Sequence, residues 1–220
     1  MQFDEQLLNK IVLEVQRQLK EWQSDTIVVG VSNRHAHLCR EDLNALFGAG
    51  HELTVLKELK QPGEFAAEEV VTITGPKGSI FNVRILGPVR NKTQVEISNT
   101  DSFVLGIKPP VRESGNVEGS PGIVLTGPKG SIKKDEGVII ARRHIHMPVE
   151  YAKTRGIKDG DCVCVRTLSG ERQLVFGNVL ARVSDRFALE MHIDLDEANA
   201  GGIKNGDRVR LVDCGIVAMG

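Results

Sequence analysis

Two stretches of this chain share one design: VVGVSNRHAHL at Val28–Leu38 and VIIARRHIHM at Val138–Met147. Each is a run of β-forming residues that ends in the pattern R-H-x-H. Side chains alternate between the two faces of a strand, so the two histidines of each stretch point to the same side. Imidazoles placed in this way can bind one metal ion together. The two stretches therefore predict a metal site that is built on strands.

The two stretches belong to an internal repeat, because other features keep their spacing in both halves. Aligning Glu96 with His192 also superposes Arg90 on Arg186, six residues earlier in each half. Each half then offers two strand histidines and a third candidate ligand. The two predicted ligand sets are His35, His37 and Glu96, and His144, His146 and His192. Three nitrogen or oxygen ligands with an open position are typical of catalytic zinc.

The composition narrows the possible functions. The chain has 220 residues, of which 40% are hydrophobic, and this length suits one large domain or two small ones. Its aromatic content of 4% and net charge of −1 argue against a nucleic-acid-binding surface. No run has the length of a membrane span, and the charged first residues do not resemble a signal peptide. We therefore expect a soluble, cytoplasmic protein that binds neither nucleic acid nor membrane.

The cysteines form no CxxC pair, and in an intracellular chain we expect all of them to be reduced and structural. They are Cys39, Cys162, Cys164 and Cys214. Cys162 and Cys164 lie two residues apart on one predicted strand, so they could alternatively bind a metal.

Many short β-type runs separated by glycine and proline predict a mostly β fold with short helical caps. The repeat divides the chain into residues 26–123 and 124–220, and a duplicated antiparallel unit of this size suggests two small β-barrels. A short helix is predicted at Arg40–Phe47, ended by Gly48. Residues 1–22 have apolar side chains at helical spacing, which predicts an amphipathic helix. This helix either packs on its own domain or lies on a partner protein as a detachable segment.

Arg90 follows a turn and precedes Glu96, so its guanidinium could clamp phosphate or carboxylate beside the metal. The turn Gly75-Pro76-Lys77-Gly78 recurs at residues 127–130 and is either a simple hairpin or a support for a phosphorylated cofactor. Neither a P-loop nor a nucleophile elbow is present. An enzyme with this sequence would use metal-assisted chemistry without a covalent protein intermediate.

The chain resembles the PduL family of phosphate acyltransferases, also called phosphate propanoyltransferases, along nearly its whole length. The segments that carry the resemblance include GVSNRHAHL, LKQPGEFAAEE, NVRILGPVR, ARRHIHM and LEMHIDLDEANA. The resemblance implies reversible transfer of a short acyl group, propanoyl or acetyl, between coenzyme A and orthophosphate. It also implies two β-barrels with exchanged first strands and two zinc ions held by the two ligand sets above.

Further roles follow from the same resemblance. It implies that Arg90 is the catalytic, phosphate-binding residue. It implies coenzyme A contacts at Val31, Ser32, Asn33, Lys77, Arg84 and Asn199. Members of the family often begin with an amphipathic helix, so residues 1–22 are expected to direct the enzyme into a bacterial microcompartment through shell or cargo proteins. A homo-oligomer that takes part in propanediol degradation is also expected.

Two other functions remain open at this stage. A binuclear zinc hydrolase of a thioester or phosphoester would use the same ligands without needing phosphate as acceptor. A zinc-stabilised scaffold docked to a shell by its helix would show no turnover. The preference between propanoyl and acetyl is equally open, since one methylene is worth about 1–3 kcal/mol in a pocket.

Overall fold

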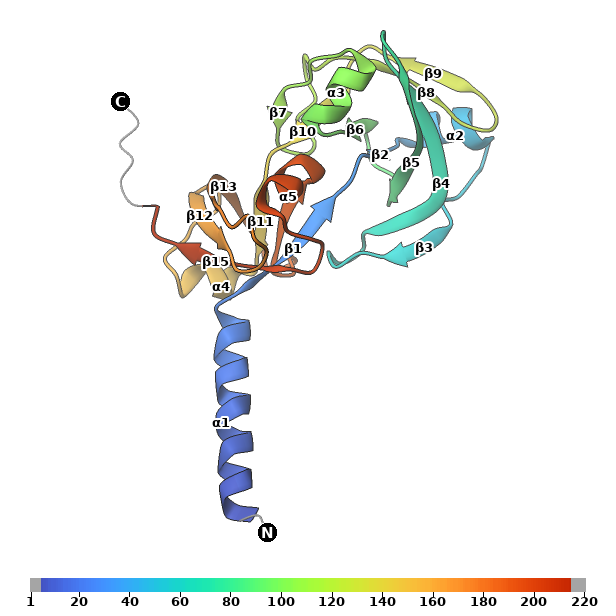
Figure 1. The fold of residues 1–220 in the computed structure, drawn as a ribbon. Coiled ribbons are helices and arrows are strands. Elements are labelled where there is room, and N and C mark those ends of the chain that lie inside the picture. Colours follow the sequence, from blue (N-terminus) through green and yellow to red (C-terminus); the bar gives the residue numbers. More distant parts are fainter. Residues whose placement is uncertain (1–4, 215–220) are drawn as a thin grey trace.

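In the computed structural model, which describes residues 5–214, a closed β-barrel lies beside an open β-sheet (Figure 1). The helices are α1 (Glu5–Ser24), α2 (Arg40–Phe47), α3 (Asn99–Leu105), α4 (Val149–Lys153) and α5 (Leu195–Gly201). The strands are β1 (Ile27–Ser32), β2 (His35–His37), β3 (Val55–Glu58), β4 (Phe65–Thr74), β5 (Ser79–Gly87), β6 (Gln94–Glu96), β7 (Val111–Arg112), β8 (Ile123–Thr126), β9 (Ser131–Lys134), β10 (Val138–Ala141), β11 (His144–Met147), β12 (Cys162–Thr167), β13 (Val175–Val183), β14 (Glu190–Asp194) and β15 (Arg208–Val212). The prediction of a mostly β fold with helical caps is confirmed.

The barrel is closed in the order β1-β14-β11-β13-β12-β15. Its core contains the apolar residues that alternate with polar ones along the strands, as the two-residue period requires. On β11, Ile145 and Met147 are fully buried in this core, which leaves His144 and His146 on the other face of the strand. The barrel core therefore fixes the direction in which the second histidine pair points.

The open sheet has the order β7-β10-β6-β2-β5-β4-β8-β9, with β3 paired to β4. Helices α2 and α3 cover its core, into which Leu43, Leu46 and Leu105 are fully buried. The helix predicted at Arg40–Phe47 is confirmed, with Gly48 at its C-terminal end. Of the two small β-barrels expected, one is closed and the other is a half-barrel sheet, whose strand order begins at β7 and ends at β9 among the described residues.

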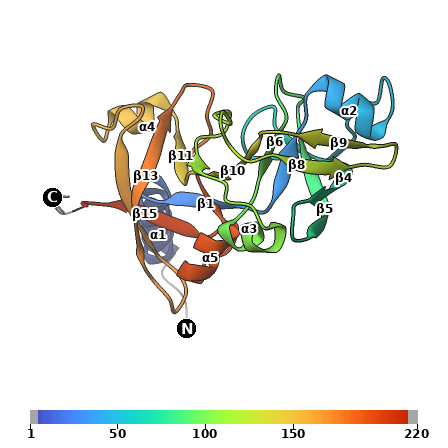
Figure 2. The same cartoon turned by 90° about the horizontal axis from the view of Figure 1, so that it is seen from above.

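The strand that precedes each histidine strand pairs with a strand of the other half. Strand β1 pairs in parallel with β14, with Gly30 opposite His192. Strand β10 pairs in parallel with β6, with Ile139 opposite Glu96. Figure 2 shows the barrel and the open sheet side by side, with β1 and β10 running between them. The division of the repeat at residue 123 stays a prediction.

Helix α1 extends away from the rest of the protein (Figure 1). The predicted helix at residues 1–22 is confirmed from Glu5 onward, and residues 1–4 lie outside the described part. Its apolar side chains are about half exposed, among them Ile11 at 51% and Val15 at 49%. Of the two alternatives, the structure favours a segment that does not pack on its own domain. None of the helices in residues 5–214 has the length and apolar character needed to cross a bilayer.

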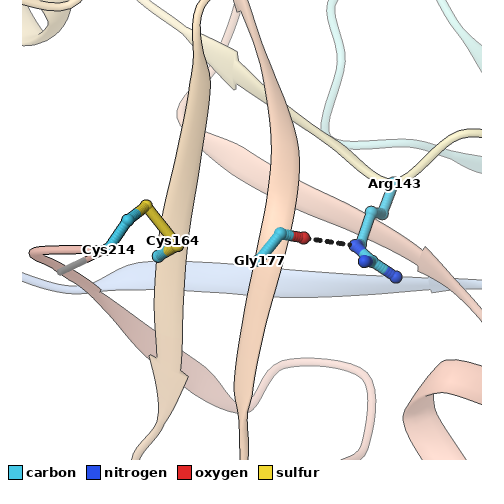
Figure 3. The surroundings of a disulfide bond; sticks show 4 residues. All are labelled: Arg143, Cys164, Gly177 and Cys214. Carbon is cyan, nitrogen blue, oxygen red and sulfur yellow. Dashed lines mark hydrogen bonds between the residues drawn. A yellow bond between two sulfur atoms is a disulfide. The ribbon is translucent and has the colours of Figure 1, made fainter. Parts of the chain in front are cut away.

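The expectation that all four cysteines are reduced is wrong for one pair. Cys164 on β12 forms a disulfide with Cys214, which follows β15 (Figure 3). The cause is strand pairing, because Cys164 lies opposite Val212 on β15 and this brings the two Cα atoms to 5.3 Å. Cys39 and Cys162 carry free thiols. Neither Cys162 nor Cys164 shares a cluster with other candidate metal ligands among residues 5–214.

Candidate functional site

A cavity of about 660 Å³ lies between the barrel and the open sheet, and both histidine strands line it. Most of the residues predicted from the sequence meet here: His35, His37, Glu96, Arg90, His144, His146, His192, Val31, Ser32, Asn33 and Arg84. Lys77 and Asn199 do not line the cavity and are exposed. Lys77 lies in the β4–β5 turn, where its backbone N–H donates to the carbonyl of Leu105 (3.1 Å).

The first ligand set is assembled by strand register. Strand β2 runs antiparallel to β6, and this pairing puts His35 directly opposite Glu96. The His35 Nε2 atom lies 3.4 Å from Glu96 Oε2. One donor atom from each of His35, His37 and Glu96 lies within 4.8 Å of the other two, and all three residues are buried. A divalent metal ion between these atoms would fit.

Backbone carbonyls orient both imidazoles of this set. His35 Nδ1 lies 2.8 Å from the carbonyl oxygen of Asn33, and His37 Nδ1 lies 3.1 Å from that of Leu86. A carbonyl oxygen only accepts, so each Nδ1 donates a proton, and in the neutral ring each Nε2 keeps its lone pair. This arrangement is common around metal-binding histidines, because it fixes the tautomer and the ring orientation.

The electrostatics of the first set also suit a cation. Burial raises the pKa of Glu96, but the facing His35 outweighs this and holds it well below its usual range. Burial lowers the pKa of His35, but the Glu96 carboxylate outweighs burial and the net shift is upward. Burial and the neighbouring His35 lower the pKa of His37 to about 3. At neutral pH His37 is therefore neutral and Glu96 is an anion, as metal binding requires.

The second set repeats the same register, since β11 runs antiparallel to β14 with His144 opposite His192. The three rings gather closely, with His146 at 4.8 Å from both His144 and His192 between centroids. The carbonyl oxygen of Arg142 orients His144 through Nδ1 (2.8 Å). His192 instead directs Nε2 toward Glu190 Oε2 (3.0 Å). Among the described residues, only the first set brings three donor atoms within 4.8 Å of one another.

His146 nevertheless has the properties of a metal-binding histidine. Both ring nitrogens are buried and have no hydrogen-bond partner in the described chain. A buried polar atom without a partner is unfavourable by about 1–3 kcal/mol, so a ligand for it is expected. Burial and the adjacent His144 lower the pKa of His146 to about 2, which leaves a neutral imidazole. His144 is likewise neutral, because burial and His192 lower its pKa to about 4.

Arg90 is connected to the first ligand set through residues that the sequence motifs did not identify. Its Nη1 donates to Ser114 Oγ (3.1 Å), and Ser114 Oγ donates to Glu96 Oε1 (2.9 Å). Gln94 Nε2 donates to the same carboxylate oxygen (2.6 Å). The Arg90 Nη2 atom lies 3.6 Å from Glu64. Burial lowers the pKa of Arg90, although a guanidinium stays charged at neutral pH.

The second set is connected across the two sheets in a similar way. Gln61, in the loop between β3 and β4, donates to Glu190 Oε2 (3.2 Å) and to the carbonyl of Ala188 (3.1 Å). Glu190 is the carboxylate that also contacts His192. A Gln-Pro-Gly sequence in a loop predicts a turn, so only the three-dimensional structure could identify Gln61 as part of the site.

The residues of the cavity that are expected to contact coenzyme A come from both sheets, since Val31 and Ser32 belong to β1 of the barrel and Arg84 to β5 of the open sheet. Val31, Ser32 and Asn33 lie at the end of β1 and directly after it, beside the first histidine strand. The Val31 N–H donates to Asn205 Oδ1 (3.1 Å). Arg84 Nη1 donates to the carbonyls of Ala67 (3.0 Å) and Glu68 (2.9 Å), which holds its guanidinium on the cavity wall.

Comparison with known proteins shows the family of the chain. Residues 28–204 match the family model described as phosphate propanoyltransferase. The chain belongs to the phosphate propanoyltransferase family. It is 61% identical over 187 residues to the phosphate propanoyltransferase of Thermotoga maritima, covering 85% of this chain and 89% of that protein. It is 57% identical over 206 residues to that of Priestia megaterium, covering 93% and 94%. The matches identify the chain as an enzyme of the acyltransferase class.

Proposed function

We propose that the protein transfers a short acyl group reversibly between coenzyme A and orthophosphate. Propanoyl is the expected acyl group and acetyl a second one. The name of the relatives supports phosphate and propanoyl as substrates. The observation that supports the proposal best is that one cavity holds two histidine sets beside an arginine that is hydrogen-bonded to the first of them.

The reaction is balanced as follows. A phosphate oxygen attacks the thioester carbonyl carbon, a C–O bond forms, and a tetrahedral intermediate with an oxyanion results. The intermediate collapses as the C–S bond breaks and the electron pair leaves with sulfur. Acyl phosphate and coenzyme A thiolate are the products, and the thiolate takes up a proton released from the phosphate. The reverse reaction follows the same path.

Arg90 has the chemistry to bind the phosphate. A guanidinium can donate two parallel hydrogen bonds to phosphate oxygens and stabilise charge that develops during the attack. Arg90 Nη1 donates to Ser114 Oγ, which in turn donates to Glu96, and this chain of hydrogen bonds holds the guanidinium beside the first ligand set. Partial burial strengthens this interaction, because the local dielectric constant is lower than in water.

The residues that would hold two zinc ions are His35, His37 and Glu96 for one, and His144, His146 and His192 for the other. When bound, zinc would act as a Lewis acid for the carbonyl and phosphate oxygens and as a soft partner for thiolate sulfur. The residues fit such ions because backbone carbonyls engage only Nδ1 of His35 and His37, and because the ring nitrogens of His146 have no partner in the part of the chain that the structure describes.

Coenzyme A would lie along Val31–Asn33 and Arg84, with its reactive sulfur near the histidines. These residues line the cavity together with the ligand sets. Lys77 and Asn199 lie outside the cavity, so their role would be limited to the distant nucleotide end of this long cofactor.

Thiol release from acetyl-, propanoyl- and butanoyl-CoA, measured with and without phosphate, tests the proposal. We expect thiol release that depends on phosphate, formation of acyl phosphate in equal amount, and about two zinc ions per chain by metal analysis. Thiol release without phosphate would instead indicate a hydrolase. Absence of turnover in the zinc-loaded protein, together with unfolding on zinc removal, would indicate a scaffold.

We further propose that α1 directs the enzyme into a bacterial microcompartment by laying its apolar face on a shell or cargo protein. The support is the half-exposed apolar stripe on a helix that leaves the body of the protein. A reporter fused to residues 1–24 should become punctate in a compartment-forming host. The double variant Ile11→Glu and Val15→Glu should stay diffuse, whereas Lys10→Glu on the opposite face should not. A diffuse wild-type fusion contradicts the idea.

A further inference from the structure

A second, smaller cavity of about 330 Å³ adjoins the site on another side. It lies between the β3–β4 loop and the β13–β14 loop. Its lining consists of Gln61, Pro62, Glu64, Arg90, Ser114, His146, Arg182, Arg186 and Phe187. All of these except Pro62, Arg186 and Phe187 also line the large cavity. The two cavities therefore meet at Arg90 and His146, beside both ligand sets.

The smaller cavity carries excess positive charge. Three guanidinium groups, those of Arg90, Arg182 and Arg186, face one carboxylate, Glu64, which lies 3.6 Å from Arg90. Neither Arg182 nor Arg186 has an ion-pair partner among residues 5–214. Unpaired cations gathered around a concave surface attract small anions, because the low-dielectric walls focus their field.

The wall of this cavity is held by aromatic contacts. The Phe187 ring stacks on His146 at 4.2 Å between centroids, and the Arg182 guanidinium lies over Phe187 at 5.6 Å. These contacts hold Arg182 over the partly buried Phe187 ring, whereas Arg186 is exposed. The positive charge thus extends from solvent, through Arg186 and Arg182, to Arg90.

Arg186 is also the repeat counterpart of Arg90. Arg90 lies in the β5–β6 loop six residues before Glu96, and Arg186 lies in the β13–β14 loop six residues before His192. Strand pairing confirms the equivalence of these loops, because β5 and β13 each run parallel to a histidine strand. The two copies differ in depth, since Arg90 is half-buried beside the ligand set and Arg186 is exposed.

We propose that Arg186 and Arg182 form an entry site for the small phosphate-bearing substrate, separate from the side of the cavity that takes coenzyme A. The ligand is orthophosphate in one direction and acyl phosphate in the other. This inference rests on the proposed function and adds a route by which the phosphate reaches Arg90. Coenzyme A keeps the part of the large cavity lined by Val31–Asn33 and Arg84, none of which lines the smaller cavity.

Steady-state kinetics of Arg186→Gln test the entry site. We expect the KM for phosphate, and for propanoyl phosphate in the reverse direction, to rise about fivefold or more, as for the loss of one exposed charge contact. At saturating phosphate, kcat and the KM for propanoyl-CoA should stay within about twofold of the wild type. The increase should shrink at high ionic strength, and Arg186→Lys should recover most of the loss. Arg172→Gln, an exposed arginine that lines neither cavity, is the matched control.

Calorimetric titration with inorganic phosphate gives a readout that does not need turnover. The Kd for phosphate should rise in Arg186→Gln by about the same factor as the KM, and in Arg182→Gln by at least as much. Equal phosphate affinity in wild type and Arg186→Gln refutes the entry site alone. A wild type that binds phosphate but releases thiol without needing it refutes the proposed reaction alone. An equal rise of KM for both substrates also overturns the proposal, because it indicates general distortion.

Discussion

Removing one hydroxyl group at Ser114 should separate phosphate binding from metal binding. Ser114 Oγ accepts a hydrogen bond from Arg90 Nη1 (3.1 Å) and donates one to Glu96 Oε1 (2.9 Å). In Ser114→Ala, Glu96 keeps its hydrogen bond from Gln94 (2.6 Å). Arg90 keeps only the contact with Glu64 at 3.6 Å, which is longer than a hydrogen bond. The arginine therefore loses more than the metal ligand does.

The size of the effect follows from these contacts. A hydrogen bond to a charged group contributes about 1.5–3 kcal/mol, and Arg90 has one such side-chain bond to lose. Each 1.4 kcal/mol corresponds to a factor of about ten, so kcat/KM for phosphate should fall about 10- to 100-fold. Zinc content should stay near that of the wild type, because Glu96 remains ionised and hydrogen-bonded.

The assay combines phosphate-dependent thiol release with metal analysis of the same preparation. Ser131→Ala, at the exposed serine that begins β9, is the matched control and should behave like the wild type. A double-mutant cycle with Arg90→Ala should show coupling, since the serine acts through the arginine. Unchanged kinetics in Ser114→Ala, or loss of zinc in proportion to activity, would refute the reasoning.

Three other changes have outcomes that the structure predicts. Arg90→Ala should lower kcat about a hundredfold or more, because it removes a stabiliser of developing charge; near-normal turnover at saturating phosphate would remove Arg90 from the mechanism. Cys164→Ser should lower the free energy of unfolding by about 4 kcal/mol in denaturant titrations without reductant, since the disulfide closes a loop with a sequence separation of 50. Cys162→Ser should leave it unchanged, and equal stabilities of the two variants would contradict the disulfide. Burial and nearby carboxylates raise the pKa of Asp194 from 3.8 to about 6. Between these pH values the folded state holds a proton on Asp194 that the unfolded state has lost. The contribution of Asp194 to the free energy of unfolding therefore falls as the pH rises from about 4 to 6. Asp194→Asn should remove that part of the pH dependence, and identical profiles in both proteins would exclude it.

The ligand-bearing strands could be predicted from the sequence because their signal is local. An R-H-x-H pattern in a β-forming run places two imidazoles on one face by geometry alone. The third ligands were predictable because a constant offset between the halves paired Glu96 with His192. In the structure these two residues lie opposite His35 and His144 in the same antiparallel register.

Other parts of the site depend on long-range contacts that leave no local pattern. Ser114 lies in a connecting segment and Gln61 in a turn, and each contacts charged residues from distant strands. The Cys164–Cys214 disulfide depends on the pairing of β12 with β15, so the spacing of the cysteines in the sequence does not predict it. The position of Lys77 outside the cavity depends on the direction of the β4–β5 hairpin.

The exchange of first strands constrains how this chain can be made. During synthesis β1 leaves the ribosome before β14 and β15, the two strands beside which it lies, have been translated. The edges of β1 can form their hydrogen bonds only after most of the chain has been synthesised, so the barrel cannot close during translation. Closure of the barrel is therefore a non-local folding step, and such steps are slow. The same exchange would be present in a domain-swapped dimer of a half-length ancestor, in which two identical copies traded first strands. Fusion of two such copies would make that trade permanent within one chain.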